Sequence, residues 1–176
     1  MIKRGNSILA WLVAGLLAVS CGYRLTPVGG LVPQDAKTIA IPVFINSTFE
    51  PYIDVEATKA VVDEFLADGR LAVADLESAD LILRGSITKF ELTPASFTSD
   101  YYVSSYNVTI SVKISLEDRR TGKFLLKDAG LGTVFIQSYS VTPSNISQTK
   151  ILKGTAVISA CKDLATSIRS RVLEGF

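Results

Sequence analysis

The chain has 176 residues, of which 48% are apolar, and its 18 Lys and Arg nearly balance its 17 Asp and Glu, for a net charge of +1. This length suits one compact domain, and the balanced charge excludes the strongly basic surface typical of nucleic-acid-binding proteins. The sequence has no histidine, which excludes His-ligated metal sites and Ser-His or Cys-His catalytic pairs. It also lacks phosphate-binding glycine loops and acidic metal motifs. We therefore expect no enzymatic activity, no metal and no cofactor.

The first twenty residues have the layout of a secretory signal. Lys3 and Arg4 precede the uncharged run Ile8 to Val19, which is too short to cross a bilayer because a spanning helix needs about 20 apolar residues. Ala18-Val19-Ser20-Cys21 resembles the lipobox of bacterial lipoproteins, which implies that Cys21 is acylated and becomes the new N-terminus. The alternative is an ordinary secretory signal with an incidental cysteine.

These features predict three segments. Residues 1–20 form a lipoprotein signal peptide, residues 21–37 a lipidated tether rich in Pro and Gly, and residues 38–176 a single domain. Residue 22 is Gly rather than Asp, which by resemblance to enterobacterial sorting rules favours the outer membrane. We thus expect a protein that is lipid-anchored at the periplasmic face of the outer membrane.

The first half of the domain is predicted to hold two strands and a helix. Thr38 to Ile45 is rich in β-branched residues, but Pro42 places this strand at an edge or a bulge. A helix beginning at Pro51 would bury Ile53, Ala57, Val61 and Phe65, joined by Val62 and Leu66, and end at Gly69. Ala79 to Leu92 predicts a long strand whose alternation slips near Thr88 and Lys89, which indicates a bulge.

The second half predicts a long hairpin and a helix. From Tyr106 to Leu116 every even-numbered residue is apolar and every odd one polar, so one face is expected to be buried. The turn Asp118 to Lys123 leads to a partner strand, Phe124 to Tyr139. A final helix from Ser147 to Leu173, capped by Asn145, presents an apolar stripe. The stripe consists of Ile151, Thr155, Ile158, Cys161, Leu164, Ala165, Ile168 and Val172.

Together the elements predict an α+β fold. We expect a two-layer sandwich, in which one mainly antiparallel sheet of about four strands carries two helices packed on one face.

Several segments, in order along the chain, resemble those of one lipoprotein family. Cys21 to Leu25 (CGYRL) is similar to its CGY or CGW start, and Ile41 to Pro51 (IPVFINSTFEP) to its IPxFxNxTxEP segment. Ala79 to Ile87 (ADLILRGSI) resembles a strand of the family, and Leu116 to Lys123 (LEDRRTGK) its DRRTGK turn. Over nearly its whole length the chain thus resembles the LptE family of lipopolysaccharide-assembly lipoproteins.

The resemblance implies a non-enzymatic role in lipopolysaccharide transport and assembly. A member of this family sits as a plug inside the β-barrel protein LptD, assists the assembly of that barrel, and binds lipopolysaccharide. The implied partners are therefore an LptD-type outer-membrane barrel, lipopolysaccharide, and the membrane through the N-terminal acyl chains, with no nucleic acid. The alternative is a lipoprotein that activates a periplasmic peptidoglycan synthase or pilots a secretin, since the fold alone does not separate these functions.

Two groups of side chains are candidates for these contacts. The loop from Thr93 to Val103 has no Lys or Arg, so no basic ligand is transferred to it from the family. Chemistry instead favours the hairpin cations as phosphate ligands, because guanidinium groups bind phosphate in a bidentate fashion, although a solvated turn is the alternative. These cations are Arg119, Arg120, Lys123 and Lys127. The aromatic residues Phe97, Tyr101 and Tyr102 are candidates for contact with acyl chains or the barrel wall, or else close the end of the core.

Overall fold

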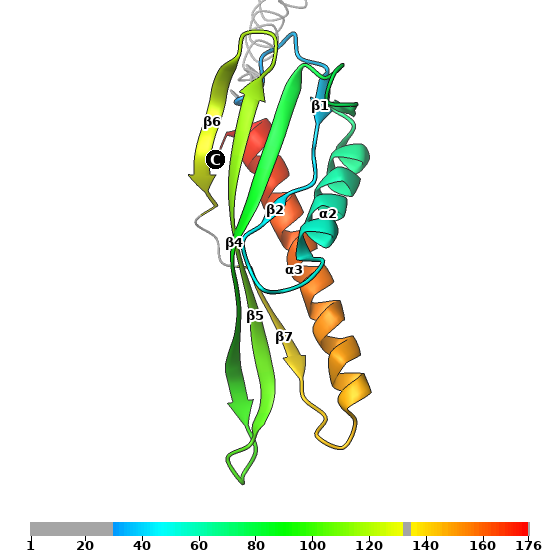
Figure 1. Ribbon diagram of the computed structural model, residues 1–176, viewed down its shortest axis with the longest axis vertical. Helices are drawn as coiled ribbons and strands as arrows, with labels where there is room; N and C mark the ends of the chain where they lie inside the picture. The colour runs from blue at the N-terminus through cyan, green and yellow to red at the C-terminus, as the bar shows by residue number, and fades with distance from the viewer. Residues whose placement is uncertain (1–29, 132–134, 176) are drawn as a thin grey trace, which may run out of the picture.

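Residues 30–131 and 135–175 are described by the computed structural model, and they form a mixed sheet with two helices against one face (Figure 1). The α+β class and the placement of both helices on one face are as predicted. The elements are β1 (Thr38–Ala40), β2 (Ile45–Asn46), α2 (Ile53–Asp68), β3 (Ala72–Val73), β4 (Leu81–Phe97), β5 (Val103–Asp118), β6 (Lys123–Gly130), β7 (Phe135–Ser140) and α3 (Ile146–Glu174).

The sheet differs from the prediction in the number and direction of its strands. It has seven strands in the order β3-β1-β4-β5-β6, with β2 paired to β4 and β7 paired to β5. The pairs made by β1, β2 and β3 are parallel, whereas β5 pairs antiparallel with β4, β6 and β7. The predicted sheet of about four mainly antiparallel strands is therefore wrong at this edge, where α2 lies in the crossover that parallel strands require.

Two predicted strands are each divided in the structure. Thr38–Ile45 is interrupted around Pro42, which has no N–H to donate, so β1 pairs with Leu81 and Ile82 while β2 pairs with Ser86 and Ile87. Phe124–Tyr139 is divided after Gly130, and β6 and β7 pair with successive parts of the same edge of β5. Gly132, the second glycine of that strand, lies outside the described residues.

The predicted hairpin across the Asp118 to Lys123 turn is present as β5 and β6, but the longest pairing in the sheet is that of β4 with β5. The predicted end of the earlier strand at Leu92 is wrong, because β4 runs on to Phe97 and pairs with β5 through most of the segment predicted as a loop.

The register of the β4–β5 pairing shifts between Ile87 and Lys89, which confirms the bulge at Thr88 and returns Phe90 to the position opposite Ile110. The even-numbered apolar side chains of β5 are buried beneath the helices, and the odd-numbered side chains point to the open face, where all but Thr109 are at least partly exposed. The buried set is Val108, Ile110, Val112, Ile114 and Leu116.

Helix α2 begins two residues later than predicted but packs as expected. Tyr52 adopts a left-handed conformation with φ of 64° at the N-cap, so the helix begins at Ile53 and not at Pro51. Gly69 ends it at φ of 74°, and its N–H donates to the Phe65 carbonyl at 3.1 Å. The predicted core positions Ile53, Ala57, Val61 and Phe65 are all buried. Val62 is only partly buried and Leu66 is 60% exposed, so these two positions were wrongly predicted, because they turn away from the sheet.

Helix α3 is capped as predicted, but the first half of its predicted stripe is wrong. The Asn145 side chain accepts from the Gln148 N–H at 3.0 Å. From Cys161 onward the stripe is buried, whereas Ile151 is 68% exposed and Ile158 is 43% exposed. The first turns of α3 extend past the end of α2 (Figure 1), so only their sheet side is covered, and Ala156 and Val157 lie there instead.

The residues just before β1 lie against the domain. Ala36 is buried, and Gly30 lies so close to the end of α3 that a β-carbon there would come within 2.1 Å of the Leu173 carbonyl oxygen. The Asp80 carboxylate accepts from the Lys37 N–H at 2.9 Å and from the Thr38 N–H and hydroxyl. These hydrogen bonds lower the pKa of Asp80 and hold the entry of the chain at this end of the sheet.

The two cysteines of the chain, Cys21 and Cys161, are predicted to have different roles. Cys161 is buried among apolar side chains, and burial raises the pKa of its thiol to about 12, so it is a core residue as predicted. Cys21 lies outside the described residues, so its acylation stays a prediction. Within residues 30–131 and 135–175, neither helix combines the length and apolar character needed to cross a bilayer.

Candidate functional site

The four cations predicted to bind phosphate lie in the β5–β6 turn and along β6. Arg119 and Arg120 belong to the turn, Lys123 is the first residue of β6, and Lys127 lies further along β6 with its Nζ 5.7 Å from the Phe124 ring centroid. Arg120 binds two carboxylates, since its guanidinium donates to Asp35 at 2.5 Å and to Asp118 at 3.4 Å. Arg120 thus joins the segment before β1 to the hairpin turn, while Arg119 and Lys123 are exposed beside it.

Arg120 lowers the pKa of both carboxylates that it contacts. The hydrogen bond from Arg120 lowers the pKa of Asp35. Burial raises the pKa of Asp118, but hydrogen bonds from the backbone N–H and the guanidinium of Arg120 outweigh burial and leave that pKa lowered. All three groups are therefore charged near neutral pH, and the positive charge of Arg120 is largely compensated within the protein.

The predicted aromatic residues lie at the opposite end of the β4–β5 hairpin. Phe97, Tyr101 and Tyr102 are 59%, 89% and 72% exposed, so they do not close the core. A tight turn presents them: the Thr98 N–H donates to the Tyr102 carbonyl at 2.8 Å, and Tyr101 adopts a left-handed φ of 64°. Such a backbone conformation is costly for a non-glycine residue.

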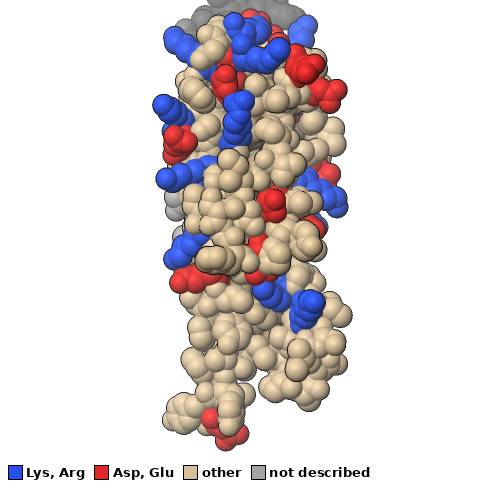
Figure 2. All heavy atoms as spheres, viewed as in Figure 1, with Lys and Arg blue, Asp and Glu red and all other residues tan. Residues whose placement is uncertain are grey.

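This aromatic end of the molecule is nearly free of charge. Between Leu92 and Val112 the one charged residue is Asp100, and between Leu131 and Thr149 there is none. Figure 2 shows the consequence on one face, where Lys and Arg lie over the upper part and the lower end is almost entirely uncharged. An uncharged surface loses little hydration free energy when a partner covers it.

A groove on the open face of the sheet was not predicted from the sequence. It has a volume of about 750 Å³ and runs across β2, β4, β5 and β6. Arg84, Lys113 and Lys127 bring three cations to it, and Asp128 brings the one carboxylate of its lining. The exposed side chains of Ile45 and Phe124 form its apolar walls.

The pairing of β4, β5 and β6 assembles this groove. Arg84 lies opposite Ser115 and Ser86 opposite Lys113, so side chains about 30 residues apart in sequence point to the same face. Lys127 was predicted as a phosphate ligand, but with the turn cations rather than with Arg84 and Lys113. The outward alternation of β5 was a signal for Lys113, whereas the placement of Arg84 beside it depends on strand register.

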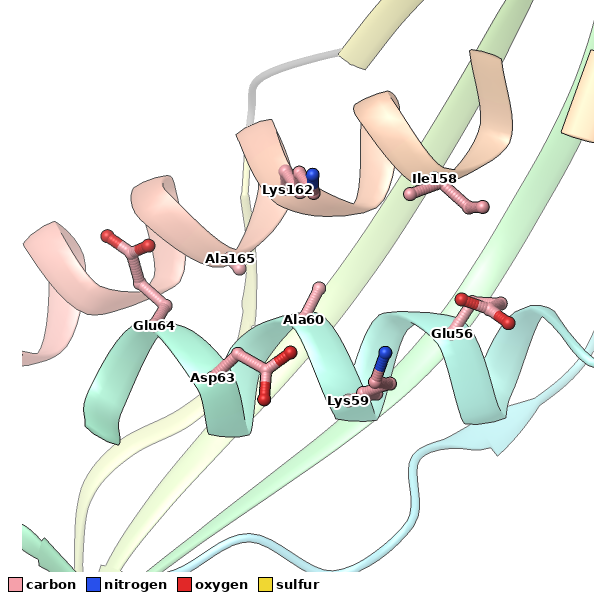
Figure 3. A pocket seen from close by; sticks show the side chains of 8 residues that line it. All are labelled: Glu56, Lys59, Ala60, Asp63, Glu64, Ile158, Lys162 and Ala165. Carbon is pink, nitrogen blue, oxygen red and sulfur yellow. The ribbon is translucent and has the colours of Figure 1, made fainter. Parts of the chain in front are cut away.

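A smaller hollow of about 230 Å³ lies between α2 and α3 (Figure 3). Ala60 and Ala165 face each other across it, and charged side chains of both signs stand around the rim. Glu64 is engaged by Arg169 at 2.8 Å. Within residues 30–131 and 135–175 no group of His, Cys, Asp and Glu is arranged to hold a metal ion. The mixed charges of this hollow select no ligand class.

The sequence matches the model of one protein family, described as LptE, lipopolysaccharide assembly, over residues 36–172. The chain belongs to the LptE family. It is accordingly a lipoprotein of lipopolysaccharide assembly and not an enzyme. Comparison with curated protein sequences found no match.

Solved structures of other lipoproteins share the fold of this LptE-family chain. A minor lipoprotein from Acinetobacter baumannii has a TM-score of 0.53 and 14% identity, with 80% of this chain and 92% of that chain covered. Rare lipoprotein B from Shewanella oneidensis has a TM-score of 0.50 and 14% identity, with 74% and 92% covered. At these identities the likeness shows the fold alone.

Proposed function

We propose that this protein is an outer-membrane lipoprotein that acts as plug and assembly partner of an LptD-type β-barrel and binds lipopolysaccharide on its way to the outer leaflet. The observation that carries the proposal is the family match over residues 36–172, which includes every strand of the sheet, all of α2 and all but the last two residues of α3. The structure supplies two surfaces for this role, the uncharged aromatic end and the open sheet face.

The position of the anchor supports an orientation for the molecule. Gly30 is nine positions along the chain from Cys21, and nine residue-to-residue steps span at most about 32 Å. Gly30 lies beside the end of α3, at the end of the molecule opposite the aromatic turn (Figure 1). The 16 residues of β5 alone extend over about 53 Å. The acyl chains would therefore hold one end at the membrane while the aromatic end reaches away from the anchor.

Acylation of Cys21 is directly testable. Labelled palmitate should enter the wild-type protein and not the Cys21→Ala variant, because the acyl chains require the cysteine thiol and the N-terminus released beside it. The buried Cys161 provides an internal control, since Cys161→Ala should leave the labelling unchanged. Equal labelling of wild type and Cys21→Ala would remove the membrane anchor from the proposal.

We propose the aromatic end as the surface that enters the barrel. Changing Phe97, Tyr101 and Tyr102 to Ser should reduce the barrel protein recovered with the chain from detergent extracts by more than about tenfold, because exposed aromatics dominate interface energies. The melting temperature should change little, since all three side chains are exposed. Full-length protein, wild type and variant, would be purified from cells and the bound barrel quantified.

A matched control removes exposed apolar side chains elsewhere. Phe49 and Val55 are also exposed, but they lie in and after the β2–α2 loop. Barrel recovery should survive Phe49→Ser with Val55→Ser. An equal loss in both variants, or full recovery with the aromatic end changed, would contradict this docking surface.

A further inference from the structure

The open-face groove concentrates positive charge that the fold does not neutralise. Lys113 and Lys127 form no ion pair with any described residue, and every Asp and Glu of the chain lies within the described residues. Arg84 pairs with Glu117 at 2.5 Å yet remains 49% exposed. Asp128 accepts from the Ser115 hydroxyl at 3.3 Å. When Glu117, the partner of Arg84, is counted with Asp128, three cations face two carboxylates, so the groove keeps a net positive charge from its lysines.

The floor of the groove adds neutral hydroxyl groups between the cations. Ser86 and Ser115 belong to this floor, with Thr88 at the bulge of β4. The Ser115 hydroxyl donates to Asp128 and the Thr88 hydroxyl donates to the Ser111 carbonyl at 3.2 Å, which leaves Ser86 to donate to a ligand. Hydroxyl groups can donate to phosphate oxygens, and ammonium and guanidinium groups supply charge-assisted hydrogen bonds to the same oxygens. This combination of donors suits a phosphate ester on a sugar, which offers both charged and neutral acceptors.

The walls of the groove distinguish an amphiphile from a small anion. Ile45 is 66% exposed on β2 and Phe124 is 49% exposed on β6, so apolar side chains stand on both sides of the cations. Covering exposed apolar surface of this kind with an acyl chain is favourable, because it removes that surface from water. The volume of about 750 Å³ exceeds the needs of a free phosphate and falls in the range of sites for larger ligands.

We propose that the groove formed by Arg84, Lys113 and Lys127 binds the phosphorylated sugar headgroup of an acylated glycolipid, with Ile45 and Phe124 contacting the start of its acyl chains. The identity of the glycolipid as lipopolysaccharide rests on the proposed function. The site is separate from the aromatic end, which lies on other parts of β4 and β5. It is also separate from the turn residues Arg119 and Lys123.

The test compares two pairs of charge reversals in the full-length lipidated protein in detergent. Lys113→Glu with Lys127→Glu reverses two charges in the groove. The control, Arg119→Glu with Lys123→Glu, makes the same change of net charge at the β5–β6 turn, outside the groove. Binding of purified lipopolysaccharide should weaken more than about tenfold in the first variant, because charge-assisted hydrogen bonds are lost. It should weaken less than about threefold in the second, and the difference should shrink at high salt.

Further variants separate the groove from folding and from a free anion. Lys113→Ser with Lys127→Ser removes the charges without reversing them, and Lys113→Arg with Lys127→Arg should keep binding within about twofold. Phe124→Ser should weaken binding of lipopolysaccharide. Inorganic phosphate should compete only weakly, since it makes no contact with the apolar walls.

The possible outcomes distinguish a failure of the groove assignment from a failure of the proposed function. If the wild type binds lipopolysaccharide and the groove variants bind it equally well, the assignment of the groove as the binding site is wrong, whereas the proposed function stands. An equal loss of lipopolysaccharide binding in the groove and turn variants, or strong competition by inorganic phosphate, would also contradict the groove as a glycolipid-binding site. Wild-type protein that does not bind lipopolysaccharide at all would contradict the proposed function itself.

Discussion

Replacing Ile110 by alanine is expected to lower the free energy of unfolding by about 2 to 5 kcal/mol. Ile110 is fully buried at the centre of β5, where it lies opposite Phe90 and beneath the helices. Its neighbour Ser111 points to the open face, so Ser111→Ala should change the free energy by no more than about 0.5 kcal/mol. Denaturant melts of residues 22–176 would measure both. Similar losses from the two variants would contradict the assignment of the two faces.

Replacing Phe44 by alanine should lower the free energy of unfolding by about 3 to 5 kcal/mol. Phe44 lies in the interruption between β1 and β2, is 2% exposed, and donates its N–H to the Thr58 hydroxyl of α2 at 2.9 Å. Its ring covers Gly85, where a β-carbon would come within 2.4 Å of ring atoms. Gly85→Ala should therefore cost about 1 to 3 kcal/mol by overpacking.

The two changes should not be additive. In the Phe44→Ala background the ring is gone, so the extra methyl group of Gly85→Ala meets no clash and fills part of the cavity. The double variant should thus lose less free energy of unfolding than the sum of the single losses, because substitutions of residues in contact are not independent and here the second change relieves its own clash. Losses that add up would mean that the ring of Phe44 does not lie on Gly85.

The elements with a long regular pattern were predictable from the sequence. The alternation of β5 determined its buried face because each residue on a strand points to the opposite side from its neighbours. The slip near Thr88 was visible as a change of phase, and the Asn145 cap and the Gly69 stop follow from local backbone chemistry. These features depend on few residues that are close in sequence.

Elements that depend on distant contacts were not predictable. β1, β2 and β3 have two or three residues each, too few to show a period or a pairing direction. Helix α3 has apolar residues on more than one side, and the side chosen near Ile151 depends on how far α2 extends along it. Pattern alone therefore placed Ile151 and Ile158 in the core, where Ala156 and Val157 lie instead.

The same limit applies to the candidate site. The sequence identified Lys127 by its charge, but Arg84 and Lys113 join it only through the pairing of β4, β5 and β6. Conversely, the sequence grouped Arg120 with its neighbours, whereas in the structure Asp35, 85 residues away along the chain, compensates its charge. Charge spacing along one strand cannot show which cations a fold neutralises and which it leaves exposed.

We propose that this protein serves lipopolysaccharide assembly at the outer membrane, and depletion of the protein from its own cells tests this role. Newly made lipopolysaccharide would be pulse-labelled during depletion, and the labelled fraction reaching the cell surface would be measured. We predict that this fraction falls as the protein is lost and recovers when the wild-type chain is expressed again. Delivery of labelled lipopolysaccharide to the surface at an undiminished rate after depletion would contradict a role of this protein in lipopolysaccharide assembly.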